Sequence, residues 1–204
     1  MKIYFVRHGS TDSLEKKISQ PDNEPLNERG ISQANELGKR FANAKIDLVI
    51  SSPHLRAVQT AKAISEDVQV SVLFAEVRKP KEVIGQSKET EEIKAIFRKI
   101  GQMYTIDPTW HYSDEENFED LKRRGLQALE FLKSQDKENI LVVSHANFIA
   151  LLAGLMLFGE NFPVEISLKL KNFLRLSNTG VCIFTYEDER WKLQCWNDTS
   201  HCLE

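Results

Sequence analysis

The stretch Ile3-Tyr4-Phe5-Val6-Arg7-His8-Gly9-Ser10-Thr11 stands at the start of the chain and decides how the rest can be interpreted. Its first four residues form a continuous apolar run, which is typical of a strand covered on both faces of a sheet. Charged and hydroxyl side chains follow at once. Because ligands of open α/β sheets bind beyond the carboxyl ends of the strands, this stretch predicts a buried first strand that leads into a binding site.

Strand and helix patterns alternate along the remaining sequence. Short apolar runs predict further strands at 46–50, 68–73 and 140–143, and a hairpin of 181–186 with 191–196. Apolar residues spaced three and four positions apart predict a helix at 31–44, and a long apolar run predicts one at 148–158. Pro53 fits the first turn of a further helix at 53–64, and Ser52 fits the N-cap of that helix. The alternation favours an α/β fold, a three-layer sandwich with a mostly parallel central sheet and helices on both faces.

A chain of 204 residues has the length of one domain with a single large core. We see no internal repeat and no linker rich in Gly, Pro or Ser. The segment at about 88–135 is predicted to be helical, with Glu- and Lys-rich faces. We therefore predict one domain, residues 1–204, with a small helical cap inserted at about 88–135.

Charge and cysteine content limit the possible partners. The chain has 27 basic and 30 acidic residues, a net charge of −3, which gives no support for a nucleic-acid surface. The 3 cysteines include no C-x-x-C pair, which suits a reducing compartment. The longest apolar run, at 148–158, is too short to span a membrane, and the first residues do not resemble a signal peptide. We predict a soluble cytoplasmic protein without a membrane partner.

Charged side chains follow the predicted strands at the same edge of the sheet. They are Arg7 and His8 after the first strand, Arg56 after the second, Glu76 after the third and His145 after the fourth. Arginines match the oxygens of a phosphoryl group, and a neutral imidazole beside cations is a good nucleophile. A carboxylic acid can protonate the leaving oxygen. This set predicts phosphoryl transfer through a phosphohistidine.

Several motifs in this order resemble those of the histidine phosphatase superfamily, the phosphoglycerate-mutase-like family. They are Arg7-His8-Gly9 with Thr11, the run 25–34 (PLNERGISQA), the run 51–61 (SSPHLRAVQTA) and Val143-Ser144-His145. The segments at 118–124, 178–179 and 197–201 are also similar to the family's, so the resemblance covers nearly the whole chain. The chain departs from the family pattern at Leu14, at Gln20-Pro21 and at Ala146.

The resemblance implies a role for each matching residue. His8 would be the nucleophile, Arg7 and Arg56 would hold the phosphoryl oxygens, and His145 would complete the pocket. Glu76 would be the proton donor because it follows the third strand, with Glu82 as the alternative. Thr11 and Ala146, beside the two histidines, are added to the expected substrate-binding residues. We expect no metal and no other cofactor, because the histidines lack metal-ligand spacing.

The function predicted from these features is metal-independent hydrolysis of a small phosphorylated molecule. Phosphoglycerate mutase activity is the first alternative, disfavoured by the short segment after His201. A phospho-ligand binding protein with weak or no turnover is the second. The basic residues Arg78, Lys79, Lys81 and Lys88 could recognise an anionic part of the substrate, or simply form a solvated loop.

Overall fold

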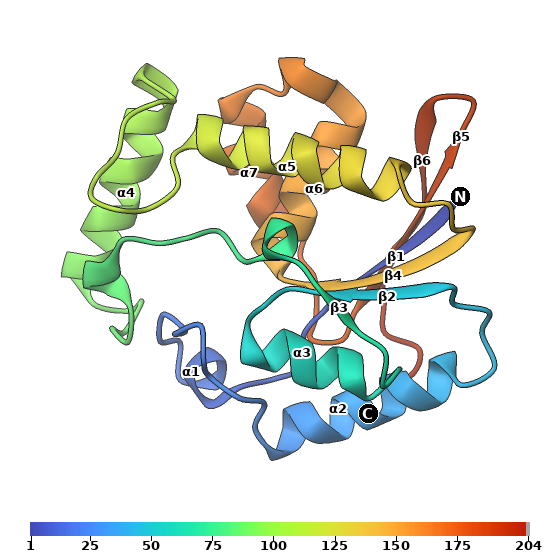
Figure 1. Ribbon diagram of the computed structural model, residues 1–204. Coiled ribbons are helices and arrows are strands. Elements are labelled where there is room, and N and C mark those ends of the chain that lie inside the picture. The colour runs from blue at the N-terminus through green and yellow to red at the C-terminus, as the bar shows by residue number, and fades with distance from the viewer. Residues whose placement is uncertain (203–204) are drawn as a thin grey trace.

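Six strands form one sheet in the computed structural model, which describes residues 1–202 (Figure 1). The order across the sheet is β3-β2-β4-β1-β5-β6. The strands are β1 (Lys2–Arg7), β2 (Leu48–Ser51), β3 (Gln69–Val70), β4 (Asn139–Ser144), β5 (Val181–Glu187) and β6 (Arg190–Asp198).

The four strands β3, β2, β4 and β1 are parallel to one another. The last two strands form the predicted hairpin, and β5 joins the sheet antiparallel to β1. The register of β1 on β4 places Arg7 opposite Ser144. The two strands therefore end side by side, and the residues that follow them enter the same space.

Helices cover both faces of the sheet (Figure 1). They are α1 (Asp12–Glu15), α2 (Glu28–Phe41), α3 (Leu55–Lys62), α4 (Glu91–Ile106), α5 (Phe118–Lys133), α6 (Ala146–Phe158) and α7 (Val164–Phe173). Leu37 of α2 and Ala57 of α3 pack in one core cluster, and residues of α5 and α6 pack in the other. The prediction of a mostly parallel three-layer α/β sandwich is confirmed.

Adjacent strands send their helices to opposite faces. The chain leaves β1 toward α2, whereas it leaves β4 toward α6 on the other face. Such a divergence opens a crevice at the carboxyl ends of the two strands, where open α/β sheets bind ligands. The fold thus places a candidate site between His8 and His145.

The third predicted strand is mostly wrong. Only Gln69–Val70 is extended, and a 3₁₀ turn follows at Val72–Phe74. Ser71 ends the strand because its side chain accepts a hydrogen bond from the backbone N–H of Leu73. The turn sends Phe74 into the core, fully buried, while Val72 stays 69% exposed. Glu76 therefore follows this turn and not a strand end.

The region at 88–135 contains two helices with different surroundings. Phe118, Leu121 and Leu132 of α5 are buried in the same core cluster as β1 and β4, so α5 is a layer of the sandwich. Only α4 stands away from the sheet (Figure 1). The single-domain organisation stays a prediction. Within residues 1–202, no helix combines the length and apolar character needed to cross a membrane.

Candidate active site

Three histidines meet beyond the ends of β1, β2 and β4. The ring centroids of His8 and His145 are 5.0 Å apart, and those of His54 and His145 are 4.7 Å apart. His8 is 2% exposed and His145 is fully buried. The two histidines predicted from their motifs are therefore neighbours, and His54 lies beside His145.

The His8 ring is held in one tautomer. Its Nδ1 lies 2.7 Å from the carbonyl oxygen of Gly9. A carbonyl can only accept a hydrogen bond, so Nδ1 carries the proton and donates it. The Nε2 atom is left with its lone pair, which is the form of imidazole that can attack an electrophile.

Charge and burial keep this imidazole neutral. Burial lowers the pKa of His8 well below the ordinary value of 6.5, and the cations of Arg56 and Arg7 lower it further. Burial also lowers the pKa of His145 well below that value, with the neighbouring His8 and Arg56 adding to the effect. Both rings are therefore uncharged near neutral pH.

Two buried nitrogen atoms in the site have no hydrogen-bond partner among the described residues. They are Nδ1 of His145 and Nε of Arg56. His145 Nε2 lies 2.8 Å from the hydroxyl of Ser52, which orients the ring. Ser52 therefore contacts His145 and is not the N-cap of α3, contrary to the sequence prediction. The N-cap of that helix is His54. Buried polar atoms without partners are costly, and oxygens of a bound phosphoryl group could pair with them.

Hydrogen bonds to backbone carbonyls hold the two arginine side chains in place. Arg7 Nη1 donates to the carbonyl of Leu176 at 2.6 Å, and Arg56 Nη1 donates to that of Pro21 at 2.8 Å. Arg56 Nη2 donates to Nδ1 of His54 at 2.9 Å. Burial lowers the pKa of both guanidinium groups, while the charge of Glu76 opposes that change. The guanidinium groups are thereby preorganised for an anion.

The two candidate acids lie in different surroundings. Glu76 lines a cavity together with His54 and Arg56, and its Oε2 lies 3.4 Å from Nδ2 of Asn147. Glu82 does not line that cavity, and its carboxylate accepts a hydrogen bond from the Ser113 hydroxyl at 2.9 Å. The geometry favours Glu76 even though no strand end carries it.

The loop that carries His8 is held from three sides. Its Gly9 N–H donates to the Thr60 hydroxyl at 3.0 Å, and the Asn178 amide donates to the carbonyl of His8 at 3.0 Å. The N–H of Thr179 donates to the carbonyl of Arg7 at 3.0 Å. Segments far apart in sequence thus fix the position of the imidazole.

The other two expected substrate-binding residues lie beside these groups. Thr11 is fully buried and caps α1, and its hydroxyl accepts from the N–H of Leu14 and from Nε2 of Gln20. Ala146 is the first residue of α6, where only its backbone N–H could serve a ligand. Direct substrate contact by either residue stays a prediction.

Two of the four basic residues that sequence reasoning left open, Arg78 and Lys79, line the cavity that contains Glu76. Burial lowers the pKa of Lys79 and of Lys88, and the charge of Glu76 acts on both ammonium groups. Lys88 is half-buried and Lys81 is exposed, and neither lines that cavity. No sequence pattern separates the two pairs, because the loop between β3 and α4 has no period that tells inward from outward.

Sequence reasoning also did not predict the contacts that hold the segment with Glu76 in place. Arg124 donates to the carbonyls of Leu73 and Ala75, both at 3.0 Å, and forms an ion pair with Glu116. The Glu116 carboxylate therefore helps to hold Arg124 against this segment. In the described part of the chain, no cluster of three or more His, Cys, Asp or Glu side chains could hold a metal ion.

The sequence is similar to those of several known proteins over nearly its whole length. The sequence model of the histidine phosphatase superfamily (branch 1) matches residues 3–199. A Hydrogenobacter thermophilus protein named "Putative phosphoserine phosphatase 2" is 28% identical, covering 98% of this chain and 97% of its own length. A Bacillus subtilis protein named "Uncharacterized phosphatase PhoE" is 26% identical over 98% of this chain and 95% of its own.

A solved structure has the same fold. The crystal structure of an Entamoeba histolytica phosphoserine phosphatase mutant in complex with phosphoserine matches with a TM-score of 0.79, over 99% of both chains. Its sequence is 24% identical, so this likeness concerns the fold alone.

Proposed function

Because the chain belongs to the histidine phosphatase superfamily, we propose that it hydrolyses phosphomonoesters through a phosphohistidine on His8. The observation that carries this proposal is the His8 imidazole. Its Nδ1 proton is donated to the Gly9 carbonyl, its Nε2 keeps the lone pair, and the charges of the two fixed arginines act on the ring.

The first half-reaction transfers the phosphoryl group to the protein. Nε2 of His8 attacks phosphorus, and the bond from phosphorus to the ester oxygen breaks. Arg7, Arg56 and the Nδ1–H of His145 hold the phosphoryl oxygens, whose charge spreads in the transition state. The carboxylic acid of Glu76 gives its proton to the departing oxygen, so the alcohol leaves neutral.

The second half-reaction returns the histidine. Water attacks phosphorus, the bond from phosphorus to Nε2 breaks, and the Glu76 carboxylate takes a proton from the water. Inorganic phosphate leaves, and Glu76 is again an acid. No redox step occurs, and the balance needs only the ester and water. The fixed arginines serve both steps because the phosphoryl group stays between them.

The test is a rapid acid-free quench with a ³²P-labelled phosphomonoester. We expect label on the protein that is stable in base and labile in acid, in wild type and in the control variant His111→Gln. His111 Nδ1 donates to the carbonyl of Glu115, away from the site. His8→Ala should carry no label and lose at least about 1,000-fold in kcat. Turnover by wild type without label would overturn the covalent mechanism.

The same preparation separates the other two functions. A phosphoglycerate mutase would interconvert 2- and 3-phosphoglycerate faster than it releases phosphate. A binding protein would bind vanadate but release no phosphate from any ester in a broad panel. We expect phosphate release, unchanged by a metal chelator, since the proposed steps use side chains only.

A further inference from the structure

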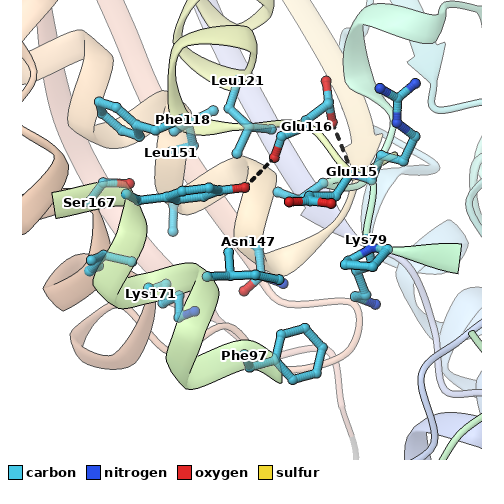
Figure 2. Close-up of a pocket in the computed structure, with 18 residues that line it drawn as sticks. Lys79, Phe97, Glu115, Glu116, Phe118, Leu121, Asn147, Leu151, Ser167 and Lys171 are labelled. Carbon is cyan, nitrogen blue, oxygen red and sulfur yellow. Dashed lines mark hydrogen bonds between the residues drawn. The ribbon is translucent and has the colours of Figure 1, made fainter. Parts of the chain in front are cut away.

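A second pocket of about 160 Å³ lies beside the proposed phosphoryl site (Figure 2). Its walls come from α4, α5, α6 and α7 and from the segment at 77–80. Most of the wall is hydrocarbon: Phe97, Ile100, Tyr104, Phe118, Leu121 and Leu151. The sandwich layers supply one side of it and the outlying helix α4 supplies the other.

The two cavities adjoin at the segment that follows the proposed acid, and Glu76 itself lines only the cavity that contains Arg56. The cavities share Val77, Arg78, Lys79 and Glu116 in their walls. Asn147 lines the apolar pocket, and its amide lies 3.4 Å from the Glu76 carboxylate. The leaving oxygen must lie next to the acid that protonates it, so the group attached to that oxygen can reach this adjoining pocket.

The acidic groups in the pocket wall are already bonded within the protein. The Glu115 carboxylate accepts from the N–H groups of Tyr112 and Ser113, and Glu116 is paired with Arg124. The Tyr104 hydroxyl donates to the carbonyl of Glu116 at 2.7 Å, visible as a dashed line in Figure 2. The tyrosine thus offers its ring to a ligand, and the two carboxylates of the wall are already bonded. The basic side chains of Arg78, Lys79 and Lys171 also line the pocket.

The size of the pocket limits the ligand. A cavity of about 150 Å³ lined by Leu, Ile and Phe accepts one benzene molecule. The pocket of about 160 Å³ therefore has room for one ring, or for an aliphatic group of similar size. We propose that the preferred substrates are phosphomonoesters of alcohols with a single apolar ring, such as benzyl-type alcohols. This inference rests on the proposed phosphatase function and names its substrate class.

The inference is tested with alkyl phosphates whose leaving oxygens are similarly basic. Differences in kcat/KM between these esters then reflect binding of the alkyl group and not the reactivity of the leaving group. Benzyl phosphate is compared with ethyl phosphate and with phosphoserine, whose ammonium and carboxylate would lose water in an apolar pocket. We expect kcat/KM for benzyl phosphate to exceed that for both by about 10- to 100-fold, the value of burying one ring. Similar or higher kcat/KM for phosphoserine would overturn the inference.

One position in the pocket wall allows a matched pair of variants. Gly101 lines the pocket from α4, and a Cβ added there meets no atom within 4 Å. Gly101→Leu would fill the pocket, whereas Gly101→Ala adds one methyl group, and both residues suit a helix. We expect Gly101→Leu to lose about 10-fold or more in kcat/KM for benzyl phosphate, but to keep wild-type activity on ethyl phosphate.

These outcomes separate the two proposals. If wild type hydrolyses ethyl phosphate and phosphoserine as well as benzyl phosphate, or if Gly101→Leu changes all three equally, the substrate class is wrong and the phosphatase stands. If no ester is hydrolysed and no label reaches His8, the proposed function fails and the substrate class fails with it. Circular dichroism and thermal unfolding of Gly101→Leu verify that the variant is folded.

Discussion

At the scale of single residues, the candidate site depends on which nitrogen and oxygen atoms are already bonded. His8 has its Nδ1 proton bound to Gly9, and Arg7 and Arg56 each spend one Nη on a backbone carbonyl. The Nδ1 of His145 and the Nε of Arg56 remain without partners. These two nitrogen atoms are therefore available to the oxygens of a bound phosphoryl group.

The proposed acid can be separated from its neighbour in sequence by a matched pair. Glu76→Gln removes the proton donor next to the phosphoryl site, whereas Glu82→Gln alters a carboxylate that is bonded to Ser113. We expect Glu76→Gln to lower kcat for ethyl phosphate by about 100- to 10,000-fold, the usual value of general acid catalysis. Glu82→Gln should stay within about twofold of wild type.

The loss should depend on the leaving group, because a good leaving group needs no proton. For 4-nitrophenyl phosphate the effect of Glu76→Gln on phosphorylation should therefore shrink. Steady-state and single-turnover kinetics on both esters measure this difference. An equal loss on the two esters, or a larger loss in Glu82→Gln, would remove Glu76 from the role of acid.

At the scale of elements, the backbone at the start of α2 is in close contact with the loop that carries His8. A Cβ added at Gly30 would lie 2.1 Å from the carbonyl oxygen of Ser10. One added at Gly9 would lie 2.6 Å from the carbonyl oxygen of Gly30. Two backbones can approach this closely only without side chains, which is one use of glycine. The contact links helix packing to the position of the nucleophile.

A methyl group at this contact should therefore affect both stability and activity. We expect Gly30→Ala to lower the free energy of unfolding by about 1–3 kcal/mol, as overpacking does. It should also lower kcat/KM, because Ser10 must move and His8 lies in the same loop. Urea unfolding and ester hydrolysis measure the two effects.

Gly101→Ala provides the control for this experiment. Its new Cβ meets no atom within 4 Å, and alanine is favoured over glycine in a helix. We expect this variant to be more stable than wild type by about 0.5–1 kcal/mol. If Gly30→Ala were as stable and as active as Gly101→Ala, the close approach would have no role in holding the loop.

At the scale of the whole molecule, burying uncharged histidines makes stability depend on pH. Burial lowers the pKa of His8 and His145 well below the ordinary value of 6.5. In the unfolded chain both would titrate near that value. Below about pH 6.5 the unfolded state therefore binds more protons than the folded state, and folding stability is lost as the pH falls.

We expect the Tm to fall as the pH is lowered from 7 to 5, measured by thermal unfolding in buffers of constant ionic strength. The double variant His8→Gln with His145→Gln should show a smaller fall, because two groups that gain protons on unfolding are gone. His111→Gln keeps both buried histidines and should retain the wild-type slope. Equal slopes in wild type and the double variant would contradict the assignment.

Most of the sandwich could be predicted because its elements carry local signals. The apolar runs of β1 and β4 reflect burial on both faces of the sheet. The helical spacing of α2 reflects burial of one face of that helix. The strand expected at 68–73 failed because Phe74 reaches the core through a turn closed by Ser71. Likewise, α5 was predicted as part of a cap because of its charged face. That face does not indicate that Phe118 and Leu132, on the other side of the helix, are buried in the core.

By itself, the sequence determined the fold class, the family motifs and the residue types that gather at the ends of the parallel strands, because these depend on local pattern and strand order. Only the tertiary structure decided the rest: the tautomer of His8, the partner of Ser52, the inward direction of Lys79 and the apolar pocket beside Glu76. Those features depend on contacts between segments far apart in the chain, and no local spacing encodes where two such surfaces meet.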